Sequence, residues 1–334
     1  MKIKKTKGEF MNNFKKIGLT ALAGSLAAVS ANAGEMAVSG AAMMSYTSQD
    51  TSEVTGNPFG LKTNLAFTGS GEMDNGFNVT YYMNSSDQFA GQTSASLSLD
   101  MGDMGTMLFD QGTGSGLWAI RDKLPKVGEE SYDSLDTTSD GFVGFGTKGK
   151  LVYSNAISDI NYSVSYMNQG AVSNSDGSAS SGGEGSSWDV SGSHSPMDGL
   201  NVYAGYGQRK ETTEANNDHD THSTVAATYA IGMVTVGAQL SNADEGDANG
   251  TLQKMQGYGI AVNINDNLSV SWNERETTYD NELTTDVDAK TEGIGLAYTM
   301  GSIKIAGNRN EVTNNGGTAS SNDSMTEIAV SFAF

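Results

Sequence analysis

Apolar and polar residues alternate along most of this chain, and the pattern recurs in segment after segment. Between residues 160 and 168, Tyr162, Val164 and Tyr166 alternate with serines, and residues 323–334 alternate in the same way up to Phe334. Successive side chains of a β-strand point to opposite faces of the sheet. A period of two therefore predicts strands with one apolar and one polar face, and its repetition predicts an all-β fold.

Sixteen such segments follow one another, separated by connections that are alternately short and long. We expect strands at 36–47, 58–69, 77–85, 94–101, 105–110, 148–155, 160–168, 186–194, 200–209, 221–230, 233–242, 251–264, 268–276, 290–299, 302–310 and 323–334. The longest connection spans residues 111–147. Sixteen antiparallel strands with both chain ends on the tight-turn side require seven short and eight long connections, and the sequence has this order.

These features together are typical of a transmembrane β-barrel. Its strands present apolar side chains to lipid and polar ones to the interior, and its turns are short on the periplasmic side and long outside. A soluble sandwich would instead pack an apolar face against a second sheet. Because Pro58 opens a strand, Pro125 lies in the longest connection and Pro196 precedes a turn, no proline interrupts a hydrogen-bonded ladder. We therefore predict a 16-stranded antiparallel transmembrane β-barrel.

The first 33 residues have the composition of a secretory signal peptide. A basic stretch at 2–16 precedes an apolar run at 17–29 and the A-x-A sequence that ends at Ala33. We predict cleavage after Ala33, with either Met1 or Met11 as the start, and a barrel formed by residues 34–334. The leader holds six of the 19 bases and one of the 39 acids, so the exported part carries a net charge of −25.

Composition excludes several other classes of protein. The chain has no cysteine, which rules out disulfides and thiolate metal centres. Its acidity argues against a nucleic-acid partner, and no segment suggests the nucleophile and base of an enzyme. His219 and His222 flank an acid in a metal-ligand pattern, but two histidines in a polar loop are a weak signal, so we predict neither a metal site nor a cofactor.

The segment 111–147 is the candidate constriction of the barrel. A lumen of sixteen strands is wide enough to hold water, and loops of 37 residues are uncommon and usually functional. We expect this segment to fold into the lumen, with Asp100 and Asp110 either holding its base or serving as ordinary lumen acids. The alternative is a solvated outer loop. Acidic side chains in a pore favour cations, and the predicted constriction sets loop acids against bases on the wall. Its residues are Asp122, Glu129, Glu130, Asp133, Asp136, Lys62, Lys150, Arg209 and Arg275.

The layout resembles the trimeric general-diffusion porins of Gram-negative outer membranes, most of all the alphaproteobacterial type. The resemblance rests on residues 35–40, 151–166, 198–207 and 258–272 and on the terminal Phe334. It implies a homotrimer in the cell outer membrane, in contact with lipid and lipopolysaccharide. It also implies that the barrel assembly machinery reads Phe334 as an assembly signal. The chain departs from such pores in having only four arginines, which are not clustered.

The resemblance implies passive diffusion of small hydrophilic solutes and ions, and the loop acids add a weak preference for cations. A substrate-selective channel is the main alternative, although it would need an aromatic slide or a dense basic cluster along the pore. A barrel that anchors a surface or adhesion protein is the other alternative, and it would need a large additional domain.

Overall fold

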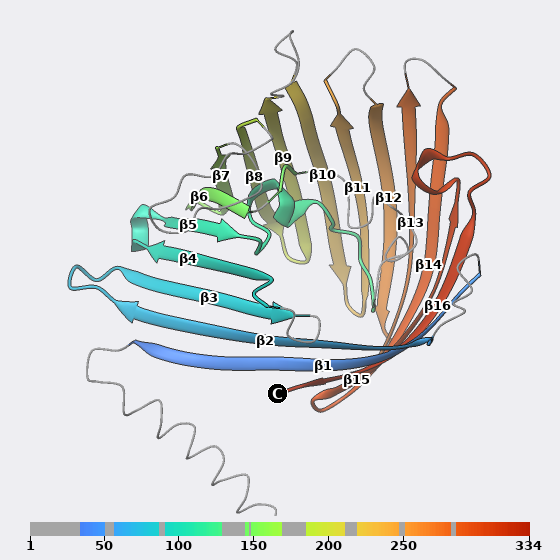
Figure 1. Cartoon of the computed structure of the whole chain (residues 1–334), viewed down its shortest axis with the longest axis horizontal. Coiled ribbons are helices and arrows are strands. Elements are labelled where there is room, and N and C mark those ends of the chain that lie inside the picture. The colour runs from blue at the N-terminus through green and yellow to red at the C-terminus, as the bar shows by residue number, and fades with distance from the viewer. Residues whose placement is uncertain are drawn as a thin grey trace, which may run out of the picture.

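The computed structural model describes residues 34–50, 57–86, 91–128, 144–146, 148–168, 185–210, 219–246, 251–281 and 285–334. These residues form sixteen antiparallel strands in one closed barrel (Figure 1). Each strand pairs with its neighbours in the chain, and the first strand, β1 (Glu35–Gln49), also pairs with the last, β16 (Asp323–Ala333). The predicted all-β, 16-stranded antiparallel barrel is confirmed. The predicted signal peptide and Ala33 lie outside the described residues.

The strands between these two have bounds close to those expected from the alternation. They are β2 (Phe59–Glu72), β3 (Asn78–Ser86), β4 (Ser94–Asp100), β5 (Thr106–Gln111), β6 (Lys148–Ile157), β7 (Ile160–Met167), β8 (Ser187–Met197), β9 (Leu200–Lys210), β10 (His219–Ile231), β11 (Val234–Asp244), β12 (Thr251–Asn263), β13 (Leu268–Asn281), β14 (Val287–Met300) and β15 (Ile303–Thr313). The same residues include three short 3₁₀ helices, η1 (Gly102–Met104), η2 (Gly116–Ile120) and η3 (Asn315–Gly317). Within this part of the chain, no helix is long and apolar enough to cross a membrane.

The two faces of the wall have opposite polarity over most of its height. Leu61, Val164 and Ile294 are exposed on the outer face, whereas Thr224 and Asn310 are buried on the inner face. A continuous exposed apolar surface of this extent is unstable in water, and it matches the apolar band with which a transmembrane barrel meets lipid. The outer face of the barrel therefore faces lipid, and the inner face is the one in contact with water.

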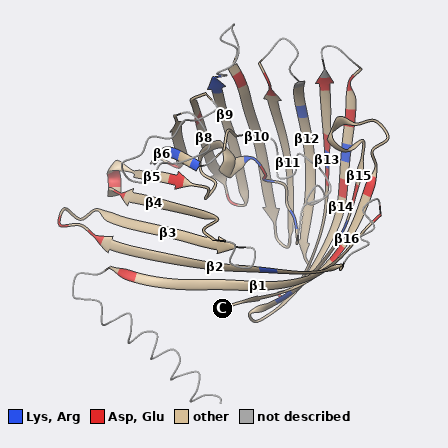
Figure 2. Ribbon diagram, viewed as in Figure 1, with Lys and Arg blue, Asp and Glu red and all other residues tan. Residues whose placement is uncertain are grey.

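The outer face becomes polar toward the loop ends of β12 to β15. On β13 the apolar side chains end at Trp272, whose indole nitrogen donates to Glu292 at 2.9 Å. Beyond it, Lys290 pairs with Glu274 at 2.8 Å, and Lys254 pairs with Asp280 at 2.8 Å. Figure 2 shows these acidic and basic segments in the upper parts of the strands. Because a lipid-facing charge costs roughly 2–4 kcal/mol at the bilayer midplane, this part of the wall must stand above the hydrocarbon.

The change from apolar to polar side chains on the outer face explains why β13 and β14 are longer than the alternation predicted. We expected β13 to end at residue 276, but its pairing with β14 continues through Thr278 and Asp288. On β13, Thr277, Thr278 and Asp280 place polar side chains on both faces, so the apolar period of two disappears while the hydrogen-bonded ladder continues. The sequence pattern reports the lipid-facing height of a strand rather than its full length.

Tight turns connect neighbouring strands at the other end of the barrel. Gly232 and Gly301 begin the turns from β10 to β11 and from β14 to β15, with φ of 60° and 61°. Two-residue hairpin loops need a positive φ at this position, which glycine adopts without strain. At the same end, Phe334 and Gly40 exchange two backbone hydrogen bonds of 2.9 Å, which join the end of the chain to β1.

Candidate functional site

The connection that leaves β5 begins with a buried acidic residue. The carboxylate of Asp110 accepts hydrogen bonds from the backbone nitrogen of Thr113 at 2.6 Å and from that of Ser115 at 2.9 Å. It also accepts from the hydroxyl groups of both residues. Asp110 therefore holds the base of the segment 111–147, which was one of its two expected roles. Asp100 instead accepts from the nitrogen of Gly102 in its own turn.

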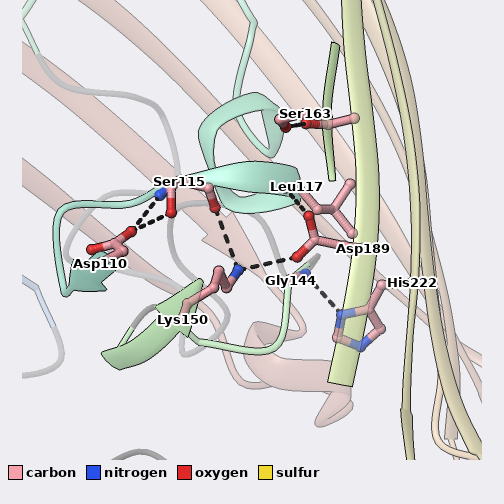
Figure 3. A network of polar contacts seen from close by, with 9 residues as sticks. Asp110, Ser115, Leu117, Gly144, Lys150, Ser163, Asp189 and His222 are labelled. Carbon is pink, nitrogen blue, oxygen red and sulfur yellow. Dashed lines mark hydrogen bonds and ion pairs between the residues drawn. The ribbon is translucent and has the colours of Figure 1, made fainter. Parts of the chain in front are cut away.

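A buried ion pair fixes the next part of this connection to β8. Lys150 of β6 contacts Asp189 of β8 at 3.1 Å and the carbonyl oxygen of Ser115 at 3.4 Å (Figure 3). The second carboxylate oxygen of Asp189 accepts from the nitrogen of Leu117 at 2.8 Å. Only 1% of the Lys150 side chain and 3% of the Asp189 side chain are exposed. Lys150 thus ties the segment to the wall instead of presenting its charge to solvent.

Glycines on the inner face make room for residues 117–127. A methyl group at Gly205 of β9 would lie 2.6 Å from Leu117, which packs with Ile120 against Tyr203. A methyl group at Gly237 of β11 would lie 2.6 Å from Pro125. Gly257 and Gly259 of β12 and Gly295 of β14 are in similarly close contact with Leu124, Pro125 and Val127. Residues 117–127 therefore lie directly on the wall between β9 and β14.

Polar side chains of the wall bind the backbone of the same residues. The amide of Gln239 on β11 accepts from the nitrogen of Lys123 at 2.7 Å and donates to the carbonyl oxygen of Arg121 at 2.7 Å. On β13, the hydroxyl oxygen of Ser271 accepts from the nitrogen of Val127 at 2.8 Å. Gln239 is buried, so these hydrogen bonds are protected from water. The course of residues 121–127 is thus set by side chains on two separate strands.

The returning end of the connection is held on β9 and β10. The nitrogen of Gly144 donates to Nδ1 of His222 at 2.8 Å, and the ring of Phe145 stacks on that imidazole with centroids 4.1 Å apart. The guanidinium carbon of Arg209 lies over the Phe145 ring, 5.6 Å from its centroid. The same guanidinium donates two hydrogen bonds to the carboxylate of Asp220. Arg209 is therefore already paired within the wall.

The geometry of β10 also argues against a metal site shared by the two histidines. His219 and His222 are three residues apart on one strand, so their side chains point to opposite faces of the barrel. Within the described residues, no group of histidine and acidic side chains is arranged to hold a metal ion.

The other predicted constriction residues have different surroundings. Arg275 is 1% exposed on β13. Asp122 pairs with Lys126, four residues further along the segment, at 3.0 Å. Lys62 is exposed on β2 and lines a recess of the inner face. Glu129, Glu130, Asp133 and Asp136 lie outside the described residues.

Sequence reasoning missed the residues that hold the segment in place. Asp189, Gln239 and Ser271 are single polar residues in alternating strands, so nothing in the sequence separates them from other lumen-facing residues. The glycines left a signal, because Gly205 and Gly207 on β9 and Gly257 and Gly259 on β12 recur at every second position. Such spacing on one face of a strand indicates close approach of another backbone.

The family model described as "Gram-negative porin" matches residues 18–334. No curated protein matches the sequence.

Solved structures share the fold at low identity. A porin superimposes with a TM-score of 0.68 and 17% identity, covering 90% of this chain and 100% of its own. The anion-selective porin from Comamonas acidovorans gives 0.63 and 14%, with coverage of 90% and 100%. The trimer form of OmpT, an outer membrane protein of Vibrio cholerae, gives 0.66 and 13%, again covering 90% and 100%.

Proposed function

The chain belongs to the Gram-negative porin family, and we propose that it is a passive channel for small hydrophilic solutes and ions with a weak preference for cations. Its place in the outer membrane and its role as a diffusion channel follow from the family and from the closed barrel. Membership in a family of channels favours transport over catalysis. We also propose that the channel prefers cations and that the segment 111–147 forms its constriction.

The observation that carries the proposal is the attachment of residues 113–127 along the inner face. A lumen of sixteen strands without an obstruction would admit most small solutes. Hydrogen bonds to Asp189, Gln239 and Ser271 hold a second layer of chain on one side of this lumen. We propose that the complete segment 111–147 narrows the channel and that solutes pass between it and the opposite wall.

The proposed cation preference rests on the charge of that segment. It contains six acids and three bases. Among the described residues, Asp122 is paired with Lys126, and the Arg121 guanidinium lies 3.7 Å from the Trp118 ring centroid. The remaining acids, Glu129, Glu130, Asp133, Asp136 and Asp140, then outnumber the bases where solutes would pass, and fixed carboxylates favour cations.

Neutralising three of these acids tests the preference. In a planar bilayer under a KCl gradient, the unmodified channel should give a reversal potential on the cation-selective side. The variant Glu129→Gln, Glu130→Gln, Asp133→Asn should lose most of that potential, because it leaves three acids against three bases in the segment. Glu311→Gln, an exposed acid on the outer face, is the control and should change nothing. An unchanged potential in the triple variant would contradict the assignment.

We further propose that the chain works as a homotrimer in contact with outer-membrane lipid and lipopolysaccharide, and that the barrel assembly machinery reads its terminal Phe334. The structural neighbour OmpT has a trimer form, and the exposed apolar outer face offers surface for both neighbours and lipid. On a detergent gel, the unheated protein should migrate as a species of about three times the mass of the heated chain. Migration of the unheated protein at the mass of a single chain, in every mild detergent tried, would contradict the trimer.

A further inference from the structure

A recess opens on the inner face where β2, β1, β16 and β15 lie side by side. Its volume is about 330 Å³, and Gly128 borders it from the segment that follows β5. Two lysines, Lys62 of β2 and Lys304 of β15, line it. Its lining also includes the short side chains of Ala41, Ala306, Ala329 and Ser331. We call this feature the lysine recess.

Strand register places the two lysines at the two ends of one row. Lys62 pairs with Met43 of β1, Met43 pairs with Ser331 of β16, and Ser331 pairs with Lys304. Three strand spacings separate the two Cα atoms by about 14 Å. Each ammonium group is carried on a flexible four-carbon stem. Both can therefore reach a solute that lies over Met43 and Ser331.

The lysine recess is a local concentration of positive charge in a strongly acidic protein. Among the described residues, neither Lys62 nor Lys304 has an ion-pair partner. Glu327 also lines the recess, but it is four residues from Ser331 along β16, which is about 13 Å. Its carboxylate accepts from the Thr47 hydroxyl at 3.0 Å. Within the described residues, neither ammonium is thus paired with the one acid that lines the recess, because the Glu327 carboxylate is hydrogen-bonded to Thr47 instead.

We propose that the lysine recess is a transient binding site for small organic dianions, with one anionic group at each ammonium. The inference rests on the proposed function as an open channel and adds a class of solute to it. A dianion engages both lysines, whereas a monoanion engages one and a neutral solute engages neither. The short lining residues leave room for the aliphatic link between two carboxylates. A weak preference for small cations is compatible with this site, because we assign that preference to the acids of the segment 111–147 and not to the wall of β1, β2, β15 and β16.

The test uses the purified full-length channel in a planar bilayer with KCl on both sides. Succinate should reduce the KCl current in a saturable way, while acetate at equal concentration and ionic strength should reduce it far less. The variant Lys62→Gln, Lys304→Gln should raise the half-blocking succinate concentration about tenfold, through the loss of two ion contacts in a wet site. Lys62→Arg, Lys304→Arg should retain the block, because it keeps both charges. Lys210→Gln, an exposed lysine at the loop end of β9, is the matched control and should behave as the unmodified protein.

The outcomes separate this inference from the proposed function. Absence of any KCl current would overturn the channel itself. A normal KCl current with equal effects of succinate and acetate would overturn only the dianion site. A succinate block that survives in the Lys62→Gln, Lys304→Gln variant would also overturn it, since binding would then occur elsewhere. The KCl conductance of each variant reports whether it has folded and inserted.

Discussion

Replacing Asp189 by alanine should destabilise the barrel by about 3–5 kcal/mol and make its current noisy. The substitution leaves the buried ammonium of Lys150 without its partner, and removing one member of a buried pair costs this much because a desolvated charge remains. It also removes the acceptor for the nitrogen of Leu117. The start of the segment then loses its anchor on β8, so we expect larger current fluctuations from the open channel.

Thermal unfolding in detergent and single-channel recording measure these two effects. Asp159→Ala is the control, because Asp159 is 68% exposed and contacts only His194 among the described residues, so its loss should cost less than about 1 kcal/mol. The double variant Lys150→Met, Asp189→Leu should recover much of the stability, since no unpaired charge is left. If Asp189→Ala were as stable and as quiet as Asp159→Ala, the anchoring role of the ion pair would be wrong.

Replacing Gly237 by valine should lower the conductance of the open channel. The first added carbon would lie 2.6 Å from a carbon of Pro125, and the branches of valine would extend further into that ring. The strand is hydrogen-bonded on both sides, so the segment has to move away from the wall and into the space left for solutes. Overpacking of this kind costs about 1–3 kcal/mol.

Single-channel conductance in KCl, together with the unfolding temperature, measures the effect. Gly69→Val on β2 is the control, because nothing lies within 4 Å of the position of its added carbon. We expect its conductance to match that of the unmodified protein. A conductance of Gly237→Val that equals or exceeds the control value would show that the close contact with Pro125 does not position the segment.

The fold could be predicted from the sequence because lipid and water impose opposite demands on the two faces of each strand. The alternation at Tyr162, Val164 and Tyr166 records that demand directly. The alternation no longer marks a strand where the outer face does not meet lipid. This happens above Trp272, where Glu274 and Glu276 face outward and β13 continues beyond its predicted end. Strand number and order were therefore predictable, whereas the part of a strand that continues above the apolar band was not.

The site was less predictable because charge alone does not reveal burial. Lys150, Arg209 and Arg275 were expected on the pore wall with Lys62, but Lys150 is buried against Asp189 and Arg209 is paired with Asp220. Their partners lie on other strands, and a single sequence gives no sign of such pairing across the barrel. Lys62 differs because its neighbours in the row are Met43 and small residues, which leave it exposed.

The pairing of β1 with β16 also governs how the chain can fold. Thr47 and Glu327, which are hydrogen-bonded in the closed wall, are 280 residues apart in the chain. Contacts of such long range carry a large loop-closure entropy and slow the search for the native state. Until this seam forms, both edge strands expose unpaired backbone groups on which another chain could polymerise. Joining the two edges removes both of these exposed edges at once, and Gly40 and Phe334, which exchange two backbone hydrogen bonds, lie at one end of the seam.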